Sequence, residues 1–382
     1  MKLRLLNPRH QLKNKGEYIG KVIISEYKGK ENSCRLFEMR SDFGACCKII
    51  EYGALITELH IPDKDGVTAD IMLGLKDLDS YMKDQSNHGS VVGRSANRIK
   101  GASYSINGKE YKAPLNDGNN NLHGGSPSYQ NVFWEGKAIS NKEANDFIKD
   151  MNIDGVAPAE GESVLLHYVS PDGACGFPGN LDTYVLYSWL KDRTLLIAYK
   201  GTSDEDTIFA PTNHAYFNLG GHDSGYIGNN ILTIDAEKVT HKTDACPDGT
   251  FIDVEGTIFD FRNGAPVSQV LTLDNDQTRA SLGVDQNFCV DKEEGKFTVV
   301  AKLTDDKSSR EMEVLTDMPG IQIYAGNHLG GNMQKGDTPY KQYGAICLEA
   351  QMYPNAVNIP EFTSPIIKKG QTVYHACGYR FN

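Results

Sequence analysis

Two short segments of this chain hold the side chains best suited to proton transfer. His214 lies within Pro-Thr-Asn-His-Ala-Tyr-Phe-Asn at residues 211–218, and Glu349 follows the apolar run Ala-Ile-Cys-Leu at residues 345–348. An unperturbed imidazole titrates near neutral pH, so it can give and take a proton at cellular pH. An imidazole and a carboxylate on rigid β scaffolding can move one proton onto a substrate and another off it. The two segments therefore indicate acid–base chemistry.

The neighbours of His214 include three hydrogen-bonding residues. Asn213 precedes the histidine, and Tyr216 and Asn218 follow it. We expect these side chains to fix the orientation of the ring and its tautomer. A single histidine can instead be a structural residue, and the segment alone does not decide between the two interpretations.

Glu349 interrupts an apolar run that has the character of a β-strand. Along a strand, Glu349 and Gln351 share one face, whereas Leu348 and Ala350 share the other. A carboxylate that enters from an apolar strand is costly unless it is paired or used. The alternative is a glutamate on an edge strand that faces water.

Two loop segments offer groups for binding a polar ligand. His123 precedes the pair Gly124 and Gly125, which lets the backbone approach a ligand closely. No Gly-Lys-Ser/Thr follows, so this segment is not a phosphate loop. Asn97 and Arg98 offer a row of donors for sugar hydroxyls or a ring oxygen, and Arg94 competes with Arg98 for that role.

Asp285 and Gln322 are further candidates for holding hydroxyl groups. Asp285 lies in Gly-Val-Asp-Gln-Asn-Phe at residues 283–288, and Gln322 lies between two isoleucines. A carboxylate accepts hydrogen bonds, and an amide both donates and accepts them. Ordinary structural roles stay open for this group of residues, such as a salt-bridged surface arginine at Arg98 or a plain surface loop at His123.

Strands must position these side chains, because strand signals dominate the chain from about residue 20 onward. Short runs rich in β-branched and aromatic residues occur at 22–24, 47–50, 164–169, 182–190 and 194–199. Residues 311–316 and 321–324 alternate polar with apolar side chains, which is typical of half-buried strands. Turn dipeptides such as Asn-Gly at 107–108 and Pro-Gly at 178–179 separate the runs. The pattern predicts an all-β fold of two packed antiparallel sheets.

Helices are expected to be few and short, with candidates at residues 75–82 and 141–151. The polar stretch 141–163 is the best candidate for a surface insertion. We find no internal repeat and no linker. The sequence therefore predicts one β-sandwich domain over residues 31–382, preceded by a partly ordered extension over residues 1–30.

Composition limits the classes of partner. The formal net charge is −11 without a long acidic run, which argues against nucleic acid or an anionic membrane as the main partner. No stretch approaches the ~18 apolar residues of a membrane span. The eight cysteines contain no Cys-x-x-Cys pair and no zinc-ligand spacing, so they indicate a reducing compartment and a cytoplasmic location.

Seven segments in this order resemble the successive signatures of the aldose 1-epimerase (galactose mutarotase) family, and they cover roughly residues 45 to 380. They are Gly-Arg-x-Ala-Asn-Arg-Ile at 93–99, Asn-Leu-His-Gly-Gly at 121–125, Phe-Pro-Gly-Asn-Leu at 177–181, Thr-Asn-His-x-Tyr-Phe-Asn-Leu at 212–219, Asp-x-Asn-Phe at 285–288, Gly-Ile-Gln-Ile-Tyr at 320–324, and Leu-Glu-x-Gln at 348–351 with Pro-Asn-Ala-Val-Asn at 354–358. The ordered set is far more specific than any one member. Residues 1–30 and 141–163 lie outside it.

The resemblance implies a large β-sandwich of the supersandwich type, with a sugar bound in an open cleft on one sheet. It implies that His214 is a general acid and Glu349 a general base in the interconversion of the α and β anomers of galactose or glucose. It also implies a set of residues that hold the sugar, namely Asn97, Arg98, His123, Tyr216, Asp285 and Gln322. No metal, organic cofactor or macromolecular partner is implied, and the protein is expected to be a monomer or a homodimer.

Three other functions compete with this interpretation. A hexose-6-phosphate 1-epimerase would need cations for the phosphate, and Arg94 and Lys100 are the candidates. A glycoside-cleaving enzyme would use Glu349 and Asp285 as its two carboxylates. A non-catalytic sugar-binding module could share the fold without the reaction.

Overall fold

The structure is a computed structural model of the chain and describes residues 20–331 and 333–382. Strands dominate it, and every pairing within its three large sheets is antiparallel. The prediction of a large antiparallel β-sandwich with few short helices is confirmed. The residues predicted as an N-terminal extension include 1–19, which lie outside the described residues.

A nine-stranded sheet is the largest layer of the fold. Its strands in spatial order are β11 (Glu135–Ile139), β12 (Ser163–Ser170), β13 (Leu181–Trp189), β14 (Thr194–Ser203), β29 (Thr372–Phe381), β23 (Arg310–Thr316), β22 (Thr298–Asp305), β17 (Ile231–Ile234) and β20 (Ala265–Pro266). The strands predicted at 164–169, 182–190, 194–199 and 311–316 correspond to β12, β13, β14 and β23, so these predictions are confirmed.

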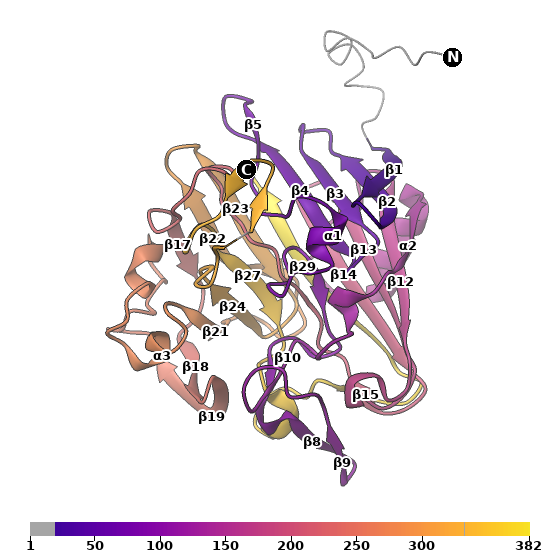
Figure 1. Cartoon of the computed structure of the whole chain (residues 1–382), viewed down its shortest axis with the longest axis vertical. Coiled ribbons are helices and arrows are strands. Elements are labelled where there is room, and N and C mark those ends of the chain that lie inside the picture. Colours follow the sequence, from indigo (N-terminus) through magenta and orange to yellow (C-terminus); the bar gives the residue numbers. More distant parts are fainter. Residues whose placement is uncertain (1–19, 332) are drawn as a thin grey trace.

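Two five-stranded sheets pack against this layer. The first consists of β1 (Val22–Lys28), β2 (Ser33–Arg40), β3 (Cys46–Ile50), β4 (Leu55–Pro62) and β5 (Thr68–Asp70). The second consists of β19 (Cys246–Asp253), β18 (Lys238–Thr243), β21 (Asp285–Cys289), β24 (Gly320–Tyr324) and β27 (Cys347–Gln351). In Figure 1 the first sheet lies at the upper right and strands β18 and β19 lie at the lower left.

Five short two-stranded pairs lie outside the three large sheets. They are β6 (Val91–Val92) with β16 (Thr212–Asn213), β7 (Arg98–Ile99) with β10 (Asn121–Leu122), β8 (Ser103–Ile106) with β9 (Lys109–Lys112), β15 (Thr207–Ile208) with β28 (Ile366–Ile367), and β25 (Gln334–Lys335) with β26 (Thr338–Pro339). The β8–β9 hairpin projects from the lower end of the molecule (Figure 1). The β6–β16 and β7–β10 pairs matter most here, because they carry the segments around His214, Arg98 and His123.

The main core lies between the nine-stranded sheet and the two smaller sheets. Ile49 of β3, Leu303 of β22 and Ile323 of β24 are all fully buried within it. In β14 the alternation of side chains is strict: Ile197 faces this core, whereas Leu196 faces a separate apolar cluster on the outer side of the large sheet. Both faces of the large sheet are therefore covered.

Helix α2 (Asn141–Met151) covers that outer face. The Ser140 side chain accepts a hydrogen bond from the Glu143 backbone N–H, and the Glu143 carboxylate accepts one from the Ser140 backbone N–H. This capping box begins the helix. Ala144 and Met151 are buried against the sheet. The helix predicted at 141–151 is confirmed, and the polar stretch that begins with it packs on the large sheet.

The other α-helices are single turns. Helix α1 (Leu78–Tyr81) occupies the second half of the helix predicted at 75–82. Helix α3 (Asp276–Arg279) was not predicted, because one turn capped by the Asn275 side chain is too short to show a periodic pattern. No helix within the described part of the chain is long and apolar enough to cross a membrane.

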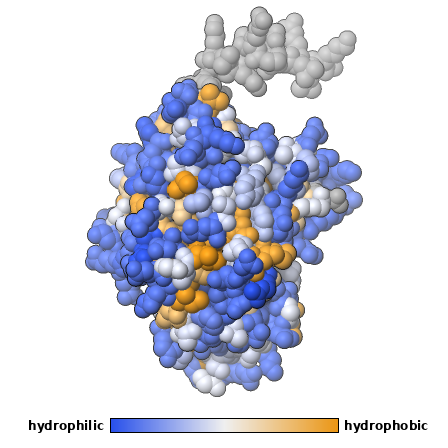
Figure 2. Space-filling view, turned by 90° about the vertical axis from the view of Figure 1, so that its left-hand side faces the viewer, coloured by the Kyte–Doolittle hydropathy of each residue, from blue (hydrophilic) through white to orange (hydrophobic). Residues whose placement is uncertain are grey.

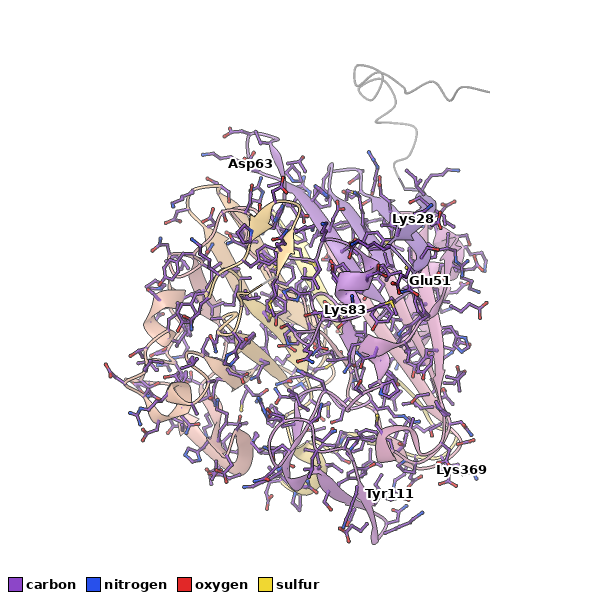
Figure 3. The ribbon with its side chains drawn as sticks, in the orientation of Figure 1. Lys28, Glu51, Asp63, Lys83, Tyr111 and Lys369 are labelled. Atoms are coloured by element: carbon purple, nitrogen blue, oxygen red, sulfur yellow. The ribbon has the colours of Figure 1, made fainter. Side chains whose placement is uncertain are left out.

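One side of the molecule is largely hydrophilic (Figure 2), with apolar groups gathered near its centre and scattered singly elsewhere. Charged side chains such as those of Lys28, Asp63 and Lys369 lie far apart around the periphery (Figure 3). All eight cysteines fall within the described residues, and each is a free thiol.

Candidate active site

Strands β21, β24 and β27 carry a row of polar side chains on one face. Asn287, Gln322 and Glu349 lie directly opposite one another across the three strands. Asp285 lies two residues along β21 from Asn287, so its side chain points to the same face. The alternate residues of these strands face the main core, and they include Phe288, Ile321, Ile323, Leu348 and Ala350. The sheet thus presents a polar surface on a rigid apolar base.

Glu349 is buried on this surface. Its side chain is only 4% exposed, so the alternative of a water-facing edge-strand glutamate is wrong. Burial raises the pKa of the Glu349 carboxyl well above its ordinary value, and the nearby Asp285 carboxylate acts in the same direction, whereas the Arg98 guanidinium opposes the shift. The protonated, uncharged carboxyl is therefore favoured in the sugar-free site.

The segment after β16 places His214 beside this strand. The Thr212 hydroxyl donates a hydrogen bond to the Ala350 carbonyl at 2.6 Å, which ties the segment to β27. The His214 backbone N–H donates to the Ser90 carbonyl at 2.9 Å, and its carbonyl accepts from the Gly89 N–H at 2.9 Å. The backbone of His214 is therefore held on both sides.

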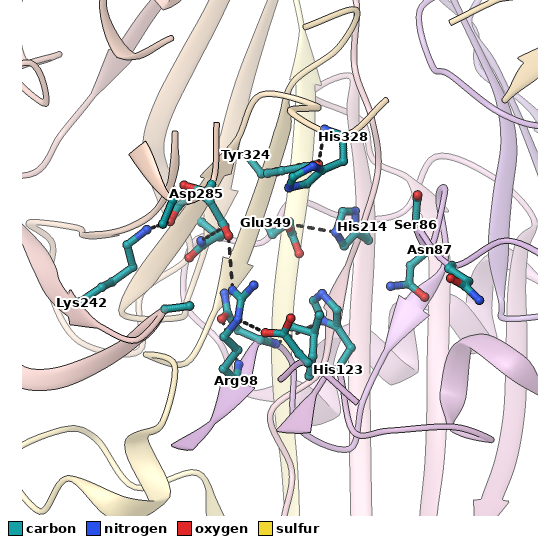
Figure 4. A pocket seen from close by; sticks show the side chains of 18 of the residues that line it. Ser86, Asn87, Arg98, His123, His214, Lys242, Asp285, Tyr324, His328 and Glu349 are labelled. Atoms are coloured by element: carbon teal, nitrogen blue, oxygen red, sulfur yellow. Dashed lines mark hydrogen bonds and ion pairs between the residues drawn. The ribbon is translucent and has the colours of Figure 1, made fainter. Parts of the chain in front are cut away.

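The ring of His214 meets a different group on each side. Its Nε2 atom lies 3.7 Å from Oε1 of Glu349 (Figure 4). Its Nδ1 atom lies 3.6 Å from Sγ of Cys347. The ring stacks on Tyr216, with centroids 5.0 Å apart, and meets the edge of His123 at 5.3 Å. These contacts fix the plane of the imidazole.

Burial also sets the charge of His214. It lowers the pKa of the imidazole to about 4, and the neighbouring His88 acts in the same direction. The expectation of near-neutral titration therefore fails for the sugar-free site, because the sequence does not show how deeply the ring is enclosed. Burial therefore favours the uncharged form of both the His214 imidazole and the Glu349 carboxyl.

The polar neighbours of His214 stabilise the backbone instead of the ring. The Asn213 and Asn218 amides donate to backbone carbonyls at 2.9 Å each, and the Tyr216 hydroxyl donates to a backbone carbonyl at 3.0 Å. The prediction that these groups would hydrogen-bond the ring and fix its tautomer is wrong. Of the three, Tyr216 touches the ring, and it does so by stacking.

Arg98, Asp285 and Gln322 form a second charged group in the site. Nη1 of Arg98 lies 3.3 Å from Oδ2 of Asp285, and Nε of Arg98 donates to Asp117 at 2.6 Å. The Gln322 amide donates to Oδ1 of Asp285 at 2.6 Å. Although burial raises the pKa of Asp285, the cations of Arg98 and Lys242 hold it below its ordinary value. Asp285 is therefore a charged acceptor in the site.

Two hydrogen bonds join Asn97 and His123. The His123 N–H donates to the Asn97 carbonyl at 2.9 Å, and the Asn97 N–H donates to Nδ1 of His123 at 3.2 Å. Both residues have left-handed backbones, with φ of 54° and 52°. Burial holds the pKa of His123 well below its ordinary value. Because Nδ1 accepts a hydrogen bond, the proton of the neutral ring is on Nε2, which makes that atom a donor.

One open pocket of about 570 Å³ joins these groups (Figure 4). The structure brings all eight residues singled out from the sequence to its wall: Asn97, Arg98, His123, His214, Tyr216, Asp285, Gln322 and Glu349. An acid–base pair thus lies among fixed donors and the Asp285 carboxylate, in a space open to a small ligand.

The chain matches a known protein family over most of its length. A family model described as aldose 1-epimerase matches residues 35–380. This chain belongs to the aldose 1-epimerase family. It is 34% identical over 349 residues to a galactose mutarotase of Bos taurus, which is 91% of this chain and 93% of that protein. It is 29% identical over 349 residues to an aldose 1-epimerase of Escherichia coli K12, which is 91% of this chain and 95% of that protein.

Solved structures agree with this assignment. The structure of galactose 1-epimerase from Lactobacillus acidophilus superposes with a TM-score of 0.78 at 25% identity, and the match covers 95% of this chain and 98% of that one. The aldose 1-epimerase assignment also confirms the resemblance that the sequence motifs indicated, and it makes the chain an isomerase of sugar anomers.

Arg94 has no place in the sugar pocket of this aldose 1-epimerase. Its guanidinium is buried and donates to four backbone carbonyls at 2.8–2.9 Å, including those of Pro178 and Gly179. The motif at residues 177–181 therefore helps to enclose Arg94. The prediction that Arg94 competes with Arg98 for the ligand is wrong, and Lys100 lies outside the pocket lining. The two cations that supported a sugar-phosphate substrate are thus elsewhere.

Further residues line the pocket and were not predicted as site residues, among them Asp117, Lys242, Tyr324 and His328. Tyr324 had a usable signal, because it lies two residues after Gln322 on the same strand and so shares its face. Lys242 lies on β18 and donates to the Asp285 carbonyl. Neither Lys242 nor His328 belongs to any of the aldose 1-epimerase segments, so no signal in the sequence pointed to them.

Two groups within the described residues have ligand atoms close enough together for a metal ion, all within 4.8 Å. In the group of Glu58, His60 and Asp70, lysine side chains already contact both carboxylates. The other group is His214, Cys347 and Glu349. There the sulfur and the carboxylate face opposite nitrogens of one imidazole. We assign neither group a metal.

Proposed function

We propose that this chain interconverts the α and β anomers of free hexoses such as galactose and glucose, with Glu349 as general base and His214 as general acid. The reaction opens the pyranose ring, rotates the C1–C2 bond and closes the ring on the other face of the aldehyde. Membership of the aldose 1-epimerase family supports the reaction. The single observation that supports the two roles is the 3.7 Å approach of the imidazole to the carboxyl group inside the pocket.

The proton balance of the pair fits both half-reactions. In ring opening, Glu349 takes the proton of the C1 hydroxyl while His214 gives a proton to the ring oxygen, so the C1–O5 bond breaks as the aldehyde C=O forms. The pair begins as carboxylate and imidazolium, ends as two neutral groups, and holds one proton throughout. Closure reverses the roles. Acid and base help of this kind is typically worth ~10²–10⁴-fold in rate.

Burial favours the protonation state that accompanies the open-chain sugar. The enclosed site raises the pKa of Glu349 and lowers that of His214. Both shifts stabilise the neutral pair relative to the ion pair. The neutral pair is the form present when the aldehyde has formed, so burial favours the open-chain stage of the reaction.

The sugar-holding residues proposed are Asn97, Arg98, His123, Tyr216, Asp285 and Gln322. The Arg98 guanidinium and the Nε2–H group of His123 are donors suited to oxygen atoms that gain charge as the ring opens. The Asp285 carboxylate can accept hydrogen bonds from sugar hydroxyl groups. Its ion pair with Arg98 and its hydrogen bond from Gln322 keep it in place. Tyr216 supplies an aromatic wall next to His214.

We further propose that the protein works on small sugars in the cytoplasm, as a monomer or a homodimer. The eight free thiols support a reducing location. The net charge of −11 supports a neutral substrate over nucleic acid or an anionic membrane.

Polarimetry of freshly dissolved α-D-galactose tests the proposal. Wild-type protein should speed the approach to the equilibrium rotation, and His214→Ala and Glu349→Gln should lower the rate to near background. His167→Ala on β12 and Glu313→Gln on β23 are matched controls on the large sheet, and both should keep the wild-type rate. A wild-type rate in His214→Ala or Glu349→Gln would refute the role given to that residue.

A further inference from the structure

A single strand contacts both nitrogen atoms of the His214 ring. Cys347 and Glu349 lie two residues apart on β27, so both side chains point to the same face. The sulfur lies 3.6 Å from Nδ1, and the carboxyl oxygen lies 3.7 Å from Nε2. The imidazole is therefore held between alternate residues of one strand. Only the carboxyl side of this contact has a role in the proposed reaction.

The sulfur side is closed to solvent. Cys347 is 0% exposed, and Tyr324 lies directly opposite it on β24. Cys347 also packs in a small apolar cluster with Tyr216, whose ring stacks on His214. Nε2 of the ring faces Glu349, which lines the pocket, whereas Nδ1 faces the buried thiol. Nothing in the mechanism above uses this thiol.

We propose that Cys347 is a positioning residue for His214: its thiol holds Nδ1, so that Nε2 faces Glu349 and the ring oxygen of the sugar. This inference rests on the proposed function, because it assigns a role in the same proton transfer. The stacking of the His214 ring on Tyr216 fixes the plane of the ring but does not distinguish its two nitrogen atoms. The thiol makes that distinction.

The chemistry of sulfur suits this position. A thiol is a weak donor and a weak acceptor, so it can accept from Nδ1–H without fixing a charge on the ring. A carboxylate in the same place would stabilise the imidazolium and oppose its loss of a proton. Burial keeps the pKa of the Cys347 thiol well above its ordinary value, so the thiol stays neutral. A neutral partner leaves His214 free to give its proton to the sugar and to take it back.

Two substitutions separate positioning from packing. Cys347→Ser keeps a group that can hydrogen-bond Nδ1, whereas Cys347→Val fills the space with apolar atoms. We expect Cys347→Val to lower kcat for mutarotation of α-D-galactose by about tenfold, the smaller of the losses typical when a histidine loses its orienting partner. KM should change by less than about twofold, because the sugar contacts stay intact. Cys347→Ser should keep kcat within about threefold of wild type.

A spectroscopic readout follows the ring directly. The ring ¹⁵N shifts of His214 in wild type and in Cys347→Ser should show one protonation pattern, and in Cys347→Val a mixture of the two neutral tautomers. Cys289→Val, a buried thiol on β21 of the same sheet, is the matched control and should leave kcat and the shifts unchanged. Thermal unfolding of each variant identifies any loss of activity that comes from misfolding.

The outcomes are distinguishable. If Cys347→Val retains full kcat and wild-type ring shifts, the thiol fills space and the inference fails while the mutarotase function stands. If Cys347→Ser loses more activity than Cys347→Val, packing outweighs positioning and the inference also fails. If His214→Ala itself retains activity, the proposed function fails first.

Discussion

The Nε2 atom of His214 and the Oε1 atom of Glu349 lie 3.7 Å apart within one pocket. This separation exceeds the usual 2.7–3.2 Å of an N–H···O hydrogen bond, so neither group is fully occupied by the other. Both can reach toward a ligand beside them. The two groups also share one enclosed space, so their protonation states change together.

The pH dependence of the reaction follows from the single proton that the pair holds. The pKa of His214 is lowered to about 4, so a second proton enters the pair, and the base is lost, only as pH falls through about 4. The pKa of Glu349 is raised well above 4.5, so the last proton is lost only at higher pH. We expect kcat/KM for mutarotation to stay level from about pH 5 to neutral pH and to fall below about pH 4.

Measurements of kcat/KM across this range, corrected for the uncatalysed rate at each pH, check this expectation. An acidic limb near 6.5, the ordinary value for histidine, would show that the imidazole titrates as if exposed. In that case the burial-driven neutral pair does not exist in the working enzyme.

Asp285 is expected to act through binding. Its carboxylate contacts Arg98 and Gln322, and it is a charged acceptor in the pocket. Asp285→Asn keeps the shape but removes the charge that holds Arg98. We expect KM for galactose to rise about tenfold and kcat to change by less than about threefold, because ground-state and transition-state binding are lost together.

Steady-state polarimetry over a range of galactose concentrations separates the two constants. Asp305→Asn on β22, outside the sugar pocket, is a suitable control and should leave both constants at the wild-type values. A large loss of kcat with an unchanged KM in Asp285→Asn would instead place this carboxylate in the chemical step.

Much of the site could be predicted from the sequence because strand alternation is a local property. Glu349 and Gln351 alternate with Leu348 and Ala350, and that pattern alone places the carboxyl on the polar face. The ordered family motifs supplied the remaining residues. Local patterns of this kind survive folding because the side-chain period of a strand is fixed at two.

The environment of His214 could not be predicted, because it depends on segments far apart in the chain. In the sequence, Cys347 looks like one more small hydrophobic residue in an apolar run. In the structure, its sulfur contacts Nδ1 of His214. In the sequence, Arg94 looks like a second cation near Arg98. In the structure, its side chain points into the protein. At a strand end or in a loop, tertiary packing sets the direction of a side chain. A local sequence pattern therefore cannot predict that direction.

Arg94 is expected to be essential for stability. Its buried guanidinium donates to the Ser170 and Thr207 hydroxyls as well as to four backbone carbonyls. Arg94→Met would leave these acceptors without partners. We expect the free energy of unfolding to fall by about 3 kcal/mol, since each unsatisfied buried group costs roughly 1–3 kcal/mol and part of the loss is relieved by water.

Denaturant unfolding measures this loss. Arg279→Met removes an exposed arginine of α3 whose side chain is 60% accessible, and it should change the free energy of unfolding by no more than about 0.5 kcal/mol. Similar values for the two variants would mean that the carbonyls around Arg94 find other partners, and that the motif at 177–181 has another purpose.

A sugar without a free anomeric hydroxyl group should bind but not react. Methyl β-D-galactopyranoside carries a methyl group on O1, so Glu349 has no proton to take and the ring stays closed. Its remaining hydroxyls still suit Asp285 and Arg98, so we expect competitive inhibition of galactose mutarotation and a raised melting temperature of the protein. Glu349→Gln should still show the thermal shift, because this variant loses the base and keeps the sugar contacts. Asp285→Asn should lose most of it. A thermal shift that survives in Asp285→Asn and disappears in Glu349→Gln would reverse the division between binding and chemistry argued above.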